Sequence, residues 1–183
     1  MKRYVLFAGC NGAGKSTLYQ TNEQFRDMPR VNLDEILREF GSWKNEKEVF
    51  EAGKIAVRRI GEYFASGTSF NQETTLCGKS IWNNIDKARN LGYWIEMHYV
   101  GVDSAETAKK RIAFRVSRGG HGISDEDVER RFSESIANLS RAISLCDVVE
   151  VYDNTEKFQK VACFERGRCV MRAETCPDWV PRS

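Results

Sequence analysis

A glycine-rich segment near the start of the sequence has the residue types and the spacing that bind a polyphosphate. Residues Gly9 to Thr17 read GCNGAGKST and match the pattern G-x-x-x-x-G-K-[ST]. Glycines let backbone N–H groups curl around phosphate oxygens, and a helix that begins there adds a favourable dipole. Lys15 is expected to reach the β- and γ-phosphates, and Ser16 to bind Mg²⁺ as a cofactor. The residues predicted to bind a nucleoside triphosphate are Gly9, Asn11, Gly12, Ala13, Gly14, Lys15, Ser16 and Thr17.

An aspartate follows the second predicted strand, at a position where a catalytic group would be well placed. Ligands of open parallel sheets bind beyond the carboxyl ends of the strands, and Asp34 is expected at such an end. There it could take the proton from an attacking hydroxyl group. The alternative is a structural role as the N-cap of a helix over residues 35–40. Spacing alone leaves both interpretations open.

Glu73 follows the third predicted strand and precedes the hydroxyl side chains of Thr74 and Thr75. A carboxylate in this position suits either a metal-bound water or a substrate hydroxyl. The alternative is that one of the two threonines caps a helix. Asp103 follows the fourth predicted strand, and there a capping role for the next helix is favoured over metal binding.

Arginines lie on both sides of a glycine-rich break, residues 119–122, which read GGHG. Three of them share one face of the preceding helix: Arg111, Arg115 and Arg118. Residues 130–131 add a second pair beyond the break. Such arginines can neutralise a γ-phosphate during transfer, and the glycines would let the segment close as a lid. A solvated basic face is the alternative, but two clusters around one hinge favour a lid at about residues 111–131.

Apolar periodicity places strands and helices in alternation along most of the chain. Strands are expected at residues 4–8, 30–33, 68–72, 93–102 and 148–152. Helices are expected at about 15–22, 46–65, 81–90 and 104–118, and again after Ser124, which has Asp127 three residues on. This alternation predicts an α/β, three-layer P-loop NTPase or kinase fold with a mainly parallel sheet. One domain is expected over residues 1–183, with a peripheral hairpin and tail at about 158–183.

Length, charge and cysteine content fit a small cytoplasmic enzyme. A chain of 183 residues can bury roughly 70% of its unfolded surface. Its net charge of +2 gives no reason to expect a nucleic-acid or membrane partner. The apolar stretch before Cys10 is shorter than the roughly 7 to 15 residues of a secretory signal. The six cysteines are expected to be free thiols.

Four landmarks in order along the chain, within about residues 4–154, resemble the zeta toxin family of P-loop kinases. They are residues 9–17, Asn32-Leu33-Asp34, Glu73-Thr74-Thr75, and the segment Arg115 to His121 followed by Arg130-Arg131-Phe132. The resemblance implies ATP-dependent phosphorylation of a hydroxyl on a sugar nucleotide, UDP-N-acetylglucosamine in the best-known members. It also implies an antitoxin protein as a partner. Family sequences often carry glycine where this chain has Thr74.

The resemblance also implies roles for individual residues near the glycine-rich loop. Asp34 corresponds to the catalytic base, while Lys15 and Ser16 correspond to the phosphate and Mg²⁺ ligands. Glu73 and Thr75 correspond to positions that bind the acceptor substrate.

Two arginines of the predicted lid correspond to the pair that grips the γ-phosphate. Arg118 and Arg131 match this pair best, with Arg115 and Arg130 as close competitors. Arg115 is also expected among the nucleotide-binding residues, and Asn154 is expected near the adenine.

Two functions other than a zeta-type kinase remain open from the sequence. The first is a metabolic kinase of another small acceptor, like shikimate or nucleoside monophosphate kinases, which would differ in the pocket around Glu73. The second is a regulatory nucleotide switch. A GTPase switch would carry NKxD and DxxG motifs, and the sequence contains neither.

Overall fold

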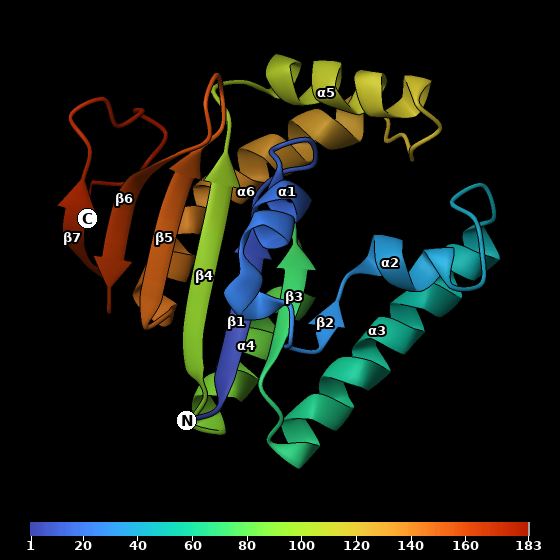
Figure 1. Ribbon diagram of the computed structural model, residues 1–183, viewed down its shortest axis with the longest axis horizontal. Coiled ribbons are helices and arrows are strands. Elements are labelled where there is room, and N and C mark those ends of the chain that lie inside the picture. Colours follow the sequence, from blue (N-terminus) through green and yellow to red (C-terminus); the bar gives the residue numbers. More distant parts are fainter. Residues whose placement is uncertain (183) are drawn as a thin grey trace.

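A seven-stranded sheet forms the centre of the computed structural model, which describes residues 1–182 (Figure 1). The strand order is β2-β3-β1-β4-β5-β6-β7, and all neighbours pair in parallel except β6, which is antiparallel to both β5 and β7. The strands are β1 (Arg3–Ala8), β2 (Arg30–Val31), β3 (Phe70–Thr74), β4 (Trp94–Gly101), β5 (Val148–Asp153), β6 (Gln159–Glu165) and β7 (Arg168–Arg172). The helices are α1 (Lys15–Thr21), α2 (Leu33–Arg38), α3 (Glu46–Ser66), α4 (Ser80–Asn90), α5 (Ala105–Ser117) and α6 (Asp125–Leu145), with a 3-10 turn, η1, at Glu23–Phe25. The predicted α/β fold with a mainly parallel sheet is confirmed.

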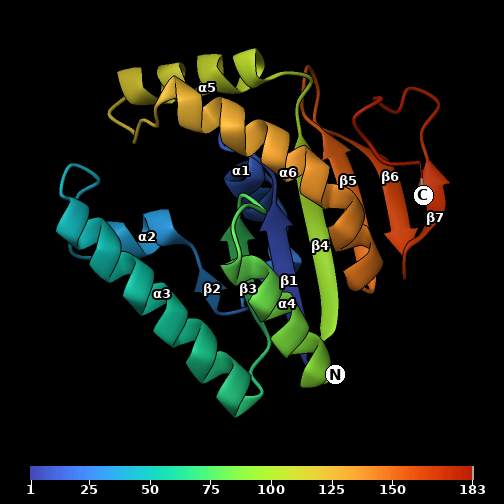
Figure 2. The ribbon, with the colours of Figure 1, turned by 180° about the vertical axis from the view of Figure 1, so that it is seen from behind.

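Strand β1 lies at the centre of the sheet, and its apolar side chains are fully buried between two layers of helices. Tyr4 and Leu6 pack in one core cluster with side chains from α3, α4 and α6, which Figure 2 shows on one face of the sheet. Val5 and Phe7 pack in the other cluster, with side chains from α1, η1 and α5. A parallel strand needs such cover on both faces, and this need explains the continuous apolar run in the sequence.

The carboxyl ends of β1, β3 and β4 meet at one edge of the sheet. Strand β1 pairs in parallel with both neighbours, so that Ala8 lies opposite Thr74 of β3 and Tyr99 of β4. Helix α5 crosses above this edge in Figure 1. After β1 the chain forms β2 and β3 on one side of β1 and then crosses to β4 on the other side. Open α/β sheets bind ligands at such a point.

The second strand is shorter than expected, and Asp34 does not follow a strand. The side chain of Asn32 accepts hydrogen bonds from the backbone N–H groups of Asp34 (2.8 Å) and Glu35 (3.2 Å), and so caps α2. Strand β2 therefore stops at Val31, and Asp34 lies in the first turn of α2. The alternative interpretation of Asp34 as the N-cap of this helix is also wrong, because the N-cap is Asn32.

Other boundaries differ less from the predictions. Strand β3 runs on to Thr74, so that Glu73 lies inside the strand and not after it, opposite Phe7 of β1. The predicted cap of α6 is confirmed, because Ser124 Oγ accepts a hydrogen bond from the N–H group of Asp127.

A hairpin of β6 and β7 extends the sheet beyond β5, and a hairpin in this region was predicted. Arg166 and Gly167 both adopt positive φ angles of 47° and 81° at its turn, the geometry of a two-residue type I′ connection. The six cysteines are free thiols, also as predicted. Among residues 1–182, no helix has both the length and the apolar content that a membrane span requires.

A buried histidine joins strands β4 and β5 beneath the layer of α1. His98 is 1% exposed and its Nε2 lies 2.8 Å from Glu96 Oε1, while its Nδ1 lies 3.2 Å from Glu150 Oε2 in a poorly aligned contact. Burial acts to lower the pKa of His98, but the carboxylates of Glu150 and Glu96 outweigh it and raise the pKa above its usual value. Arg3 pairs with Glu96 and Lys160 with Glu150, which balances the charge of the group.

The free energy of unfolding should therefore depend on pH through His98. Because its folded-state pKa is raised, the stabilisation is complete below the unfolded-state pKa of about 6.5. It is lost as the pH rises from there through the higher folded-state pKa, by up to about 1.4 kcal/mol per pH unit. Urea unfolding across this range should show the loss in the wild type and not in His98→Asn. An equal dependence of the unfolding free energy on pH in wild type and His98→Asn would contradict this role of His98. The control is His121→Ala, which removes the other histidine and should keep the wild-type dependence.

Candidate active site

The loop between β1 and α1 has the backbone geometry of a phosphate cradle. Gly14 has φ of 108°, and a Cβ atom there would lie 2.5 Å from Asn154 Nδ2. A Cβ atom on Gly9 would lie only 2.0 Å from the carbonyl oxygen of Val100. Glycine is therefore required at both positions, where the backbone lies too close to its neighbours for a side chain, and this tight path leaves the loop N–H groups able to surround a phosphate.

Lys15 lies at the start of α1 with only 6% of its surface exposed. Its ammonium group donates a hydrogen bond to the carbonyl oxygen of Cys10 at 2.9 Å, which holds it across the loop. Its Nζ lies 3.9 Å from Glu73 Oε1. A buried cation needs a partner, and Glu73 supplies one.

The carboxylate of Glu73 connects the glycine loop with the start of α2. Its Oε2 accepts hydrogen bonds from Ser16 Oγ at 3.0 Å, Arg30 at 2.6 Å and Asn32 Nδ2 at 2.8 Å. The hydroxyl of Ser16 and this carboxylate are adjacent hard oxygen donors of the kind that Mg²⁺ prefers. The residues present therefore fit the cation that the loop motif implies.

Arg30 is an unpredicted member of the site. Its side chain is 7% exposed, and it pairs with Glu35 at 2.9 Å as well as with Glu73. It also donates to Asn71 Oδ1 and lies 3.7 Å from the ring centroid of Tyr19. Buried charges of this kind are stable only when their partners are complete, so Arg30 fixes the orientation of Glu73.

Asp34 lies half-exposed near the mouth of this group. Among residues 1–182 its carboxylate accepts no hydrogen bond from another residue, in contrast to Glu73. A carboxylate free of partners is available to a ligand. Thr75, the other predicted acceptor contact, is half-buried and directly follows β3.

One arginine of the predicted lid segment reaches the loop. Arg131, on α6, donates a hydrogen bond to Asn11 Oδ1 at 3.2 Å and lies 3.5 Å from Asp127. Its neighbour Arg130 points elsewhere and pairs with Asp127 and Glu134 at an exposed position. The structure thus separates these two competitors in favour of Arg131 as the residue beside the phosphate loop.

The other two candidate arginines stay within the lid segment. Arg115 donates two hydrogen bonds, at 3.1 Å and 2.6 Å, to the carbonyl oxygen of His121. Arg118 ends α5, and its guanidinium group lies 4.6 Å from the ring centroid of Phe114. The structure brings neither of them to the glycine loop.

Asn154 supports the loop from the far side. Its Nδ2 donates to the carbonyl oxygen of Ala13 at 2.8 Å, and its own carbonyl accepts from Arg111 at 2.6 Å. The sequence prediction placed Asn154 near the adenine, and the structure places its side chain against Ala13 of the loop.

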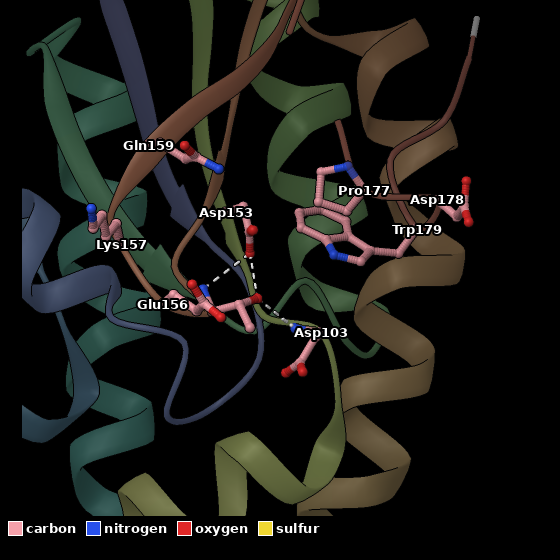
Figure 3. A pocket seen from close by; sticks show the side chains of 9 residues that line it. Asp103, Asp153, Glu156, Lys157, Gln159, Pro177, Asp178 and Trp179 are labelled. Carbon is pink, nitrogen blue, oxygen red and sulfur yellow. Dashed lines mark hydrogen bonds between the residues drawn. The ribbon is translucent and has the colours of Figure 1, made fainter. Parts of the chain in front are cut away.

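A separate hollow of about 640 Å³ opens beside the ends of β4 and β5 (Figure 3). It is lined by Asp103, Asp153, Thr155, Glu156, Lys157, Gln159, Pro177, Asp178 and Trp179. Four carboxylates against one lysine make it unsuitable for a polyphosphate, and no residue of the glycine loop lines it. Asp103 lines this hollow. The sequence analysis predicted that Asp103 caps α5, but the N-cap of that helix is Ser104.

Solved structures identify the fold that carries this site. A chain of the AvrRxo1-ORF1:AvrRxo1-ORF2 complex with sulphate ions superposes with a TM-score of 0.74 at 15% identity, over 93% of this chain and 61% of that chain. The two chains share one α/β fold. The same complex with ATP gives a TM-score of 0.70 at 14% identity, over 93% and 60%. The PezAT toxin–antitoxin system of Streptococcus pneumoniae gives 0.59 at 14% identity, over 93% and 71%.

Sequence comparison adds one relative. A Haemophilus influenzae protein described as uncharacterized is 28% identical over 128 residues, which are 70% of this chain and 91% of that protein. No family model matches the sequence. The chain spans about three fifths of the AvrRxo1 chains that it matches.

Proposed function

We propose that this protein is an ATP-dependent kinase that transfers the γ-phosphate of ATP to a hydroxyl of a sugar nucleotide such as UDP-N-acetylglucosamine. The observation that carries the proposal is the group around Glu73, which joins Lys15 and Ser16 of the loop to Arg30 and Asn32 beside α2. A nucleotide on the loop and an acceptor beside α2 would thus lie on two sides of one fixed carboxylate.

In this proposal the loop Gly9 to Thr17 binds the triphosphate and Lys15 turns from Glu73 to the β- and γ-phosphates. Asp34 takes the proton of the acceptor hydroxyl while that oxygen bonds to the γ-phosphorus, and the bond from the γ-phosphorus to the oxygen that leaves with ADP breaks. Thr75 and Glu73 orient the acceptor. Because Asp34 has no competing hydrogen bond, it is ready to accept this proton.

Ser16, with Glu73 behind it, would hold Mg²⁺, and the bound cation would neutralise the charge that develops on the phosphates during transfer. Arg131 lies beside Asn11 of the loop and would meet the γ-phosphate oxygens. Arg118 remains in the proposal as a second contact, which requires the α5–α6 connection to move after ATP binds. Arg115 is proposed to act through that connection, and Asn154 to border the nucleotide.

The acceptor class rests on the four landmarks that resemble zeta toxins. Three of them, residues 9–17, 32–34 and 73–75, meet around Glu73. The fourth reaches the loop through Arg131. Because ATP is bound in a neighbour of the same fold, ATP is the proposed phosphate donor.

The remaining parts of the proposal concern the whole protein. Residues 1–183 would form one catalytic domain, with residues 111–131 as its lid and residues 158–183 as a peripheral extension. An antitoxin protein is the proposed partner, since PezAT is a toxin–antitoxin system. The proposed compartment is the cytoplasm, where the six free cysteines would stay reduced.

Incubation with Mg·ATP and single acceptors, followed by mass spectrometry, tests the acceptor. UDP-N-acetylglucosamine should gain one phosphoryl group, and nucleoside monophosphates and shikimate should not. A phosphorylated monophosphate or shikimate, with the sugar nucleotide unchanged, would replace the acceptor class and favour a metabolic kinase.

Arg131→Ala should lower kcat by about 10²–10³-fold with little change in the Kd of ATP, because the side chain acts on charge that develops during transfer. Arg130→Ala is the matched control on the same helix and should leave both constants unchanged. Steady-state kinetics and ATP titration measure the two. A loss in Arg130→Ala and none in Arg131→Ala would reverse the assignment. An equal loss in Arg118→Ala would show that Arg118 also reaches the phosphates.

A further inference from the structure

Two chain connections that are far apart in sequence meet through one aromatic pair. The connection between α2 and α3 carries Trp43, and the connection between α5 and α6 carries His121; both connections lie at the same end of the molecule (Figure 1). The two rings are stacked with centroids 3.9 Å apart and an interplanar angle of 14°. This spacing leaves no room for a ligand ring between them, so the pair is a closing contact and not a binding slot.

Contacts within the α5–α6 connection fix the backbone on which His121 lies. Arg115 holds the carbonyl oxygen of His121 with two hydrogen bonds. Gly119 has φ of 82°, and a Cβ atom on Gly120 would lie 2.5 Å from Cγ of Arg115. The arginine and the two glycines before the histidine are therefore needed together, which explains this part of the sequence.

The proposed base, Asp34, lies in the first turn of α2, the helix that leads into the connection carrying Trp43. Burial lowers the pKa of His121, the carboxylate of Asp34 acts to raise it, and the nearby Arg115 and Arg131 lower it further. The lowered pKa favours the neutral imidazole, which stacks on Trp43 without competing for the charge of Asp34. Because the acceptor is proposed to lie beside α2, the pair stands at the acceptor side of the site.

We propose that Trp43 and His121 form a clasp that holds the α5–α6 connection over Asp34 and positions the acceptor hydroxyl against that carboxylate. The contact between the two rings does not depend on the proposed kinase function, but the positioning role of the clasp rests on it. Trp43 and His121 are positioning residues here, and neither takes part in bond making or breaking.

Limited trypsin cleavage after Arg118 tests the contact without any substrate. Cleavage follows the population of the open form when opening is fast, and an aromatic pair of this kind should change that population about two- to tenfold. His121→Ala and Trp43→Ala should be cleaved faster by that factor, and His121→Phe, which keeps a ring, should resemble the wild type. Phe40→Ala, on the same connection as Trp43 but outside the stack, is the matched control. Equal cleavage of His121→Ala and wild type would overturn the clasp.

Kinetics with UDP-N-acetylglucosamine as the acceptor probe test the positioning role. His121→Ala should raise KM for the acceptor or lower kcat, by up to about 10²-fold, while the Kd of ATP stays the same because ATP binds the loop. His121→Phe should recover most of the loss. Faster cleavage with unchanged kcat and KM would overturn the positioning role. If the wild type phosphorylates no acceptor, the proposed function falls and the positioning role with it, while the cleavage rates still decide whether the clasp exists.

Discussion

Asp34→Asn should abolish phosphoryl transfer and leave ATP binding intact. A general base contributes about 10²–10⁴-fold to rate, and asparagine keeps the size of the side chain but cannot take up a proton. The substitution should not disturb α2, because that helix is capped by Asn32 and not by Asp34. Single-turnover transfer and ATP titration on the same preparation measure the two effects separately.

Glu39→Gln is the matched control for this substitution. Glu39 ends the same helix, and its carboxylate pairs with Arg59 on α3, away from the loop. We expect normal transfer in Glu39→Gln. If Asp34→Asn turned over at the wild-type rate, Asp34 would not be the base, and its unpartnered carboxylate would have no assigned role.

Lys15→Ala should have the second large effect and should act on the nucleotide itself. The ammonium group is the one charged side chain of the loop, and its removal should lower kcat by about 10²–10³-fold, the cost of losing one electrostatic contact in a closed site. ATP affinity should fall as well, because the same group meets the phosphates in the ground state. Kinetics and ATP titration measure both changes.

The folded structure should survive Lys15→Ala. Glu73 loses a cation at 3.9 Å but keeps Arg30 at 2.6 Å, so that no carboxylate is left buried without a partner. The thermal midpoint should therefore stay close to that of Lys110→Ala, an exposed lysine on α5 that serves as the control. Normal ATP affinity and turnover in Lys15→Ala would remove the loop from the active site.

The elements with strong local patterns were predictable from sequence. The glycine loop follows an apolar run that only a buried strand explains, and β1 and α1 lie where this pattern requires. The long helix expected over residues 46–65 spans Glu46–Ser66. Periodicity suffices in these cases because one face or one run is buried along the whole element.

The start of α2 could not be predicted because two side chains there compete for the same role. Asn32 and Asp34 are both good N-caps, and the choice depends on where β2 ends. That end depends in turn on pairing with β3, where Arg30 lies opposite Asn71. The same register brings Arg30 to Glu73, and this explains why sequence patterns alone missed Arg30.

The contacts of the arginines in the predicted lid segment could not be predicted from sequence. Helical spacing groups Arg115 with Arg118, yet the turn after α5 sends the first to a carbonyl oxygen and the second onto Phe114. The stack of His121 on Trp43 joins two connections with irregular backbone. No periodic signal exists for such contacts, and only the assembled fold brings them together.

The most direct test of the account follows the γ-phosphate itself. Wild type and Asp34→Asn would be incubated with Mg²⁺, γ-labelled ATP and UDP-N-acetylglucosamine, and the label separated into acceptor, inorganic phosphate and unreacted ATP. We expect label on the acceptor with wild type and none with Asp34→Asn, although both bind ATP. Bound ATP whose label stays on the nucleotide or leaves only as inorganic phosphate, with every acceptor offered, would contradict a kinase and indicate a nucleotide switch.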